Sequence, residues 1–232
     1  MSWMPTMQRR RNFARAAPPS APSDVPLDPL TRFIQFGLLV VPSASTIRGG
    51  SCSCDRMGCP SPGAHPLSRA WQSEASADAD RVARWRVQHP EANYVSPTGR
   101  THDVLDVPAD AGAAALERLL TAGTVLGPVA VADDRYLFFT APRTSLDDAD
   151  DEWWSCDLDC RPENVAEHPG LRWHDRGSYV PVPPSLLPSG RAAQWAHWPE
   201  DTEDGATTLP DSLVVLDVLA DELADTEPVA AH

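Results

Sequence analysis

Three cysteines and one histidine lie close together in the sequence, from Cys52 through Cys54 and Cys59 to His65. Thiolate sulfur and imidazole nitrogen are preferred ligands of zinc, and a Cys₃His set fills all four positions of a structural site. The segment is rich in glycine and proline, so the chain can fold back on itself. The pattern predicts a structural Zn²⁺ site at these four residues. Free loop thiols are the alternative, because the Cys-x-Cys spacing is tighter than usual.

A second cysteine pair, Cys156 and Cys160, precedes His168 and His174. A Cys₂His₂ site can be drawn from these residues, but their spacing is unusual for zinc. We therefore expect the two cysteines to be ordinary thiols. Three histidines are expected on the surface: His102, His174 and His197.

A short hydrophobic strand, Val104–Val107, carries a carboxylate at Asp106. Metal-dependent chemistry at such a strand would need a second carboxylate beside the first. Asp103 does not supply it, because side chains alternate along a strand and Asp103 points to the opposite face. The strand therefore has the pattern of a catalytic strand without its second carboxylate.

The 232-residue chain has a net charge of −14 and contains no lysine. The absence of lysine excludes Schiff-base chemistry, a lysine general base and a P-loop lysine. The acidity opposes nucleic-acid binding by the chain as a whole, although a local groove can differ. The motifs G-x-S-x-G, H-E-x-x-H and G-x-G-x-x-G are missing, so hydrolase, metalloprotease and dinucleotide-binding classes have no support.

No apolar run in the sequence is long enough to span a bilayer. The basic residues Arg9–Arg11 are not followed by an apolar run that would make a secretory signal. We therefore expect no membrane partner and a cytoplasmic location.

Helices and strands intermix along the chain, which predicts an α+β fold with a mixed or antiparallel sheet and helices packed against it. A helix followed by a strand is expected within 27–41, further helices at 76–88, 110–122 and 211–223, and further strands at 94–95, 104–107, 128–131, 135–140, 178–182 and 194–198. In the last two helices we expect the buried residues to be Leu116, Leu119 and Leu120, then Leu213, Leu216, Ala220 and Leu223. Residues 1–26 are predicted to be a disordered tail, 27–200 one domain, and 201–232 an acidic linker with an amphipathic helix.

Several motifs occur in an order that resembles a known family. They are Pro62-Gly63-Ala64-His65-Pro66, Trp71, Trp85, Pro97-Thr98-Gly99, the strand 104–107, and the segment 178–185 with its Tyr-Val-Pro-Val-Pro-Pro-Ser sequence. Over about residues 30–198 this set resembles the N-terminal domain of bifunctional DNA primase/polymerases (Prim-Pol), and most of all short, stand-alone actinobacterial members with a Cys-rich loop. The resemblance implies an archaeo-eukaryotic primase-like core, in which an RRM-like sheet lies beside a smaller α/β unit.

The resemblance also implies where catalytic groups would lie. In active members the first motif has two aspartates, and here it has Asp106 and Pro108. The second has a histidine after a Gly-Gly turn, and here it has Asp133-Asp134 and Tyr136. The third is an aspartate ahead of the Tyr-Val strand, and here it is Arg172. One key position of four remains, and the acidic turn would repel a triphosphate.

These features favour a primase/polymerase-like protein that has lost nucleotidyl transfer and acts as a binding or regulatory module. One alternative is an active DNA primase/polymerase with displaced carboxylates, drawn from Asp103, Asp106 and Asp175. Another is a zinc-stapled protein-interaction module with no nucleotide role. Zn²⁺ is the expected structural cofactor, and Mg²⁺ or Mn²⁺ is expected only with catalysis. The expected partners are single-stranded DNA, a nucleotide or a protein, and Tyr136, Phe138 and Phe139 are expected to be sheet core instead of a base-stacking platform.

Overall fold

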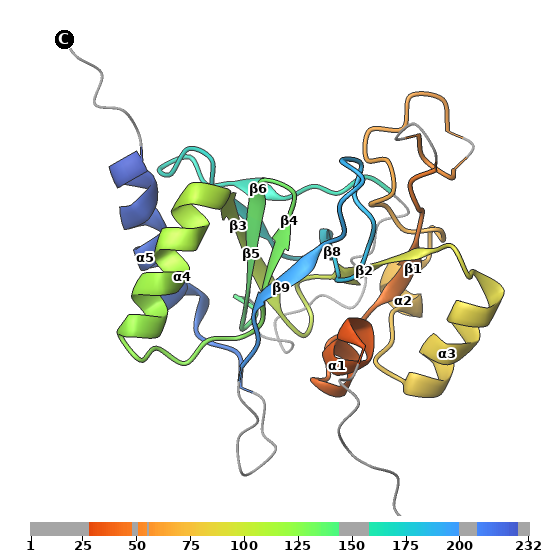
Figure 1. Cartoon of the computed structure of the whole chain (residues 1–232), viewed down its shortest axis with the longest axis horizontal. Helices are drawn as coiled ribbons and strands as arrows, with labels where there is room; N and C mark the ends of the chain where they lie inside the picture. Colours follow the sequence, from red (N-terminus) through yellow and green to blue (C-terminus); the bar gives the residue numbers. More distant parts are fainter. Residues whose placement is uncertain (1–27, 48–50, 55, 144–157, 200–207, 227–232) are drawn as a thin grey trace, which may run out of the picture.

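Two antiparallel sheets form the centre of the protein (Figure 1). The computed structural model describes residues 28–47, 51–54, 56–143, 158–199 and 208–226. The six-stranded sheet has the order β6-β7-β3-β5-β4-β9, and the three-stranded sheet has the order β1-β2-β8. The strands are β1 (Val41–Ser43), β2 (Asn93–Pro97), β3 (Asp103–Pro108), β4 (Val129–Ala132), β5 (Arg135–Thr140), β6 (Glu163–Asn164), β7 (Arg172–His174), β8 (Tyr179–Pro181) and β9 (Gln194–His197).

Two helices cover one face of the larger sheet, as the left of Figure 1 shows. They are α4 (Ala109–Thr121) and α5 (Ser212–Thr226). Because alternate residues of β3 share a face, Leu105 and Val107 both pack into this helical layer. Ala115 and Leu219 meet them from the helices. The helix at 212–226 is thus part of the core, not an appendage to it.

The opposite face of the larger sheet packs against the N-terminal part of the chain. This part contains α1 (Pro29–Gln35), α2 (Trp71–Glu74), α3 (Ala79–Gln88), β1 and β2, and β8 from later in the chain completes its three-stranded sheet. Val104 of β3 lies in one core cluster with Phe33 of α1 and Val180 of β8. Strand β3 is therefore buried on both faces, and its residues before Pro108 are all buried.

The predicted fold class and most of the predicted elements are confirmed. The hairpin of β4 and β5 turns at Asp133, which takes a positive φ of 56°. Asp78 caps α3 by accepting a 2.6 Å hydrogen bond from the Arg81 amide. The helix begins at Ala79 instead of residue 76, because Ser76 is held in a β-bridge to Val40.

Several local predictions are wrong. His102 and His174 were expected on the surface, but both are buried. Leu120 and Leu213 are exposed, at 46% and 59%. The inner face of α5 presents Val215 and Leu219 beside the predicted Leu223, because α5 packs against both α4 and the sheet. Strands β6 and β7 were not expected, since two- and three-residue strands are too short to show a periodicity of two.

Among the residues that the structure describes, no helix is long and apolar enough to cross a membrane. The predicted tail at 1–26 lies outside the described residues, as does most of the predicted linker.

Gly112 allows α4 to approach β5 closely. A Cβ atom added at Gly112 would lie 2.4 Å from the Cβ of Tyr136. We therefore expect Gly112→Ala to lower the free energy of unfolding by about 1–3 kcal/mol through overpacking. Alanine is otherwise the better helix former by about 1 kcal/mol. Urea denaturation measures the change, and Ala113→Gly on the exposed side of α4 is the propensity-only control. Unchanged or higher stability of Gly112→Ala would contradict this close approach.

Candidate functional site

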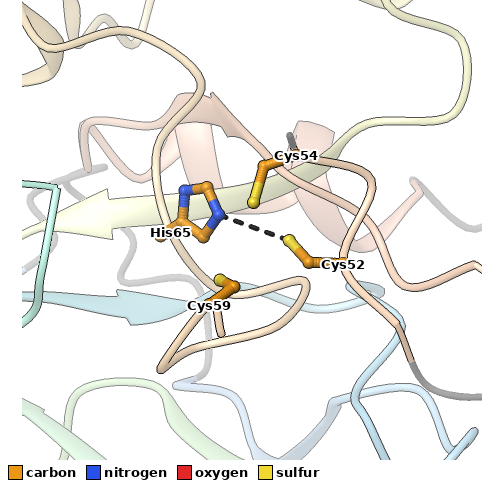
Figure 2. A group of neighbouring side chains, drawn as sticks. All are labelled: Cys52, Cys54, Cys59 and His65. Atoms are coloured by element: carbon orange, nitrogen blue, oxygen red, sulfur yellow. Dashed lines mark hydrogen bonds between the residues drawn. The ribbon is translucent and has the colours of Figure 1, made fainter. Parts of the chain in front are cut away.

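Cys52, Cys54, Cys59 and His65 come together in the loop between β1 and α2 (Figure 2). One ligand atom from each residue lies within 4.8 Å of the others. The Sγ of Cys52 is 3.3 Å from Nε2 of His65. Three sulfurs and one nitrogen converging on one point could hold a metal ion. Within the described part of the chain, this is the one such group of three or more metal-binding side chains.

His65 is oriented for a ligand role. Its side chain is buried, and Nδ1 lies 3.0 Å from the carbonyl oxygen of Pro66. A carbonyl oxygen only accepts hydrogen bonds, so Nδ1 carries the proton and the Nε2 lone pair faces the sulfurs. A second hydrogen bond of this kind is the usual means of orienting a metal-ligating histidine.

The surroundings of two of the cysteine thiols shift their pKa values in opposite directions. Burial raises the pKa of Cys52, but hydrogen bonds from the Gly63 amide and from Cys54 lead the contacts that lower it to about 7. Burial and then the neighbouring Cys54 and Cys52 raise the pKa of Cys59 to about 11. A cation between the sulfurs would favour the ionised form of these thiols.

Backbone contacts hold the cysteine loop against the three-stranded sheet. The amide of Ala44 donates to the carbonyl of His65 at 2.8 Å, and Asn93 Nδ2 donates to the carbonyl of Gly63 at 2.9 Å. A partly exposed ion pair of 2.9 Å joins Arg56 of the loop to Asp159. The loop is thus fixed at its base, next to β1 and β2.

The second cysteine pair does not gather a metal site among the described residues. Cys156 lies outside them. Cys160 lies 3.7 Å from Nδ1 of His174 and 3.0 Å from Oγ of Ser178. Burial raises the pKa of Cys160, but His174 and Ser178 together bring it below the ordinary value for a thiol.

Asp106 is enclosed by positively charged groups. Nε of Arg135 lies 2.6 Å from Oδ1 of Asp106, and Nη2 of Arg135 donates to the Asp106 carbonyl at 2.9 Å. His174 Nε2 is 3.3 Å from Oδ2, and Nη1 of Arg172 is 3.8 Å from the same atom. The carboxylate is only 6% exposed. Both of its oxygens therefore already face cations.

Neighbouring strands supply these partners. Arg172 of β7 is the direct cross-strand neighbour of Asp106, and Arg135 of β5 is paired with Pro108. His174, two residues along β7, points to the same face as Arg172. Burial alone would lower the pKa of His174, but hydrogen bonds to Asp106 and Cys160 and the charges of these groups raise it to about 9.

Asp103 lies on the other face of β3 from Asp106. Its Oδ2 accepts hydrogen bonds of 2.9 Å from Trp173 Nε1 and from the Arg143 amide. The Arg143 side chain forms an ion pair with Asp175. Burial raises the pKa of Asp103. Three candidate carboxylates are therefore divided between two faces, and the strand alternation expected from the sequence is observed.

The positions of the second motif also have structural contacts. Asp133 accepts a hydrogen bond from Ser189 and lies 3.4 Å from Nη2 of Arg191. Phe138 and Phe139 are buried, as expected for sheet core, and Tyr136 packs partly buried against the helical layer. One charge of the acidic turn thus has a positive neighbour.

Sequence reasoning did not identify Arg135 and His174 as partners of Asp106. Arg135 begins a predicted strand, but only the register of β3 and β5 brings it beside Asp106. His174 lies in β7, a strand too short to be predicted. The alternation Arg-Trp-His at 172–174, polar on one face and aromatic on the other, was the one available signal.

Comparison with known proteins gives one result. Residues 28–218 match the family model described as bifunctional DNA primase/polymerase, N-terminal. The match spans most of the 232-residue chain. No curated protein matches the chain.

The Asp106–His174 pair predicts a specific pH dependence of stability. Free histidine has a pKa of 6.5, so protonated His174 stabilises the fold fully below that pH. This contribution, on the order of 3 kcal/mol, is lost as the pH rises towards 9. In urea denaturation at pH 6, 7.5 and 9, the free energy of unfolding should therefore fall more steeply with pH for the parent protein than for His174→Gln. Parallel profiles for the two proteins would contradict the pairing.

Proposed function

The chain belongs to the bifunctional DNA primase/polymerase N-terminal family, and we propose that it is a primase/polymerase-like domain that binds nucleic acid or nucleotide without catalysing nucleotidyl transfer. The observation that carries the proposal is the enclosure of Asp106. A carboxylate that accepts a 2.6 Å hydrogen bond from Arg135 and faces His174 and Arg172 is not available to a divalent ion.

The neighbouring positions support the loss of catalysis. Two Mg²⁺ ions need several carboxylates on one side of the sheet. Pro108 and Arg172 occupy the places that the family resemblance assigns to two further aspartates. An arginine at such a place contributes a positive charge where a metal would require a negative one. Asp103 cannot substitute, because it faces the helical layer.

We further propose that the metal at the cysteine loop is structural zinc. The donor set of three sulfurs and one imidazole nitrogen suits zinc better than the hard cations Mg²⁺ and Ca²⁺. Four protein ligands would leave no open position for catalysis. Cys54, Cys59 and the loop around them bury few apolar side chains, so the metal would supply much of the stability of the loop.

Primer synthesis tests the loss of catalysis. The parent protein and Asp106→Asn should both incorporate labelled deoxynucleotides on a single-stranded template only at the level of a protein-free blank, with Mg²⁺ or with Mn²⁺. The reason is that Arg135 and Arg172 occupy the surroundings of the carboxylate. An active primase/polymerase run in parallel shows that the assay works. Robust synthesis that disappears in Asp106→Asn would refute the proposal in favour of the active enzyme.

Metal analysis of the reduced protein tests the zinc site. We expect about one zinc per chain, because one group of four ligands is present. Cys54→Ser and His65→Ala should each lose stoichiometric zinc and unfold at a lower temperature. Cys160→Ser is the matched control, since Cys160 contacts His174 and Ser178 instead of the loop. The zinc site is excluded if the reduced parent protein holds no stoichiometric zinc.

A further inference from the structure

The groups around Asp106 carry more positive than negative charge. One carboxylate is surrounded by the guanidinium groups of Arg135 and Arg172 and by the imidazole of His174. Even with His174 neutral, the two arginines outnumber the single acid. Burial lowers the pKa of His174, but Asp106 and the Cys160 thiol raise it to about 9. Cys160 is a negative partner of His174 when ionised, so the excess of positive charge rests on the two arginines. Electrostatically the site suits an anion and not a cation.

The guanidinium of Arg172 can donate hydrogen bonds to a ligand. Its Nη1 lies 3.8 Å from Asp106, which is beyond hydrogen-bond distance, and its side chain is 48% exposed. Arg135 differs, because its Nε and Nη2 are used by Asp106 and by the carbonyl of Gly170. Arg135 thus holds the carboxylate, while the planar donor face of Arg172 is open to a ligand from solvent.

The described N-terminal residues carry a small net positive charge. Residues 28–47, 51–54 and 56–102 hold 7 arginines and 5 acidic residues, a net charge of +2. Residues 103–143, 158–199 and 208–226 hold 7 arginines and 15 acidic residues, a net charge of −8. Ser178, which hydrogen-bonds His174 at 2.7 Å, leads directly into β8, and β8 pairs with β2 of the N-terminal part. The net-positive Asp106 site therefore adjoins the described N-terminal residues, whose net charge is also positive.

We propose that the Asp106 site binds a phosphate group directly through the guanidinium of Arg172, supported by Arg135, and needs no divalent cation. The inference rests on the proposed function, since it assigns to the non-catalytic site its ligand class. Arginine recognises phosphate through paired N–H donors. The phosphate can come from a nucleotide or from a nucleic-acid backbone, and the two sources share this chemistry.

The test measures binding of three probes in buffer freed of divalent cations by a chelating resin. The resin replaces a soluble chelator, because a chelator would also strip metal from the cysteine loop. Inorganic tripolyphosphate and dATP are titrated calorimetrically, and a fluorescein-labelled 16-nucleotide oligo-dT is titrated by anisotropy. Binding without Mg²⁺ supports the proposal. The strongest probe identifies the source, since tripolyphosphate and dATP represent the free nucleotide and oligo-dT the backbone.

The decisive variant is Arg172→Ala, which removes a side chain that is 48% exposed and should leave the fold intact by circular dichroism. We expect it to weaken binding about tenfold, and for oligo-dT to reduce the salt-dependence slope by about one. Arg172→Lys should recover part of the loss by retaining the charge. Arg118→Ala is the matched control, because Arg118 pairs with Asp221 and Glu222 in the helical layer on the other face.

Asp106→Asn separates an anion site from a metal site by the sign of its effect. Removing the one negative charge should tighten phosphate binding a few-fold at an anion site, whereas it would abolish metal-bridged binding. The proposal is overturned by any of three results: no probe binds, binding requires Mg²⁺, or Arg172→Ala binds as tightly as Arg118→Ala. Primer synthesis is a separate measurement from phosphate binding. The proposed loss of catalysis can therefore be refuted while the proposed phosphate binding stands, and phosphate binding can be refuted while the loss of catalysis stands.

Discussion

A carboxylate buried inside a protein must meet a positive or hydrogen-bonding group, because an uncompensated charge there destabilises the fold by several kcal/mol. Strand β3 carries two such carboxylates on opposite faces, Asp106 and Asp103. Arg135 and His174 compensate the first, and the indole of Trp173 donates to the second. Strand β7 supplies a partner on each face, His174 for Asp106 and Trp173 for Asp103. Its pairing with β3 therefore compensates both carboxylates in addition to forming backbone hydrogen bonds.

The same constraint decides which chemistry the sheet can support. A carboxylate can be neutralised by arginine or can ligate a metal, and the lone pairs used for one are lost to the other. In this protein Arg135 uses two of its donors on Asp106, and Arg172 stands across the strand pair. At the place where our proposal puts a lost cation site, the groups in contact with Asp106 carry more positive than negative charge. This inversion links the proposed loss of nucleotidyl transfer to the proposed direct binding of phosphate.

A short segment connects the Asp106 site to the cysteine loop. Asp159 forms an ion pair with Arg56 of the loop, and the next residue, Cys160, lies beside His174, which in turn contacts Asp106. Cys160 also packs in the small cluster that contains Trp71 and Tyr179. A series of polar contacts therefore connects the cysteine loop to the larger sheet through the residues next to the three-stranded sheet. A metal at Cys52 and its neighbours would stabilise one end of that series.

The sequence by itself determined the features that depend on residue type and short spacing. The Cys₃His set, the alternation along β3, the hairpin at Asp133 and the absence of a second carboxylate at Pro108 are all local properties of the chain. Tertiary structure decided which side chains meet Asp106, because Arg135 and His174 lie 29 and 68 residues away and are brought there only by strand register. It also buried His102 and His174 and exposed Leu120 and Leu213, since burial depends on which elements pack together and not on residue type.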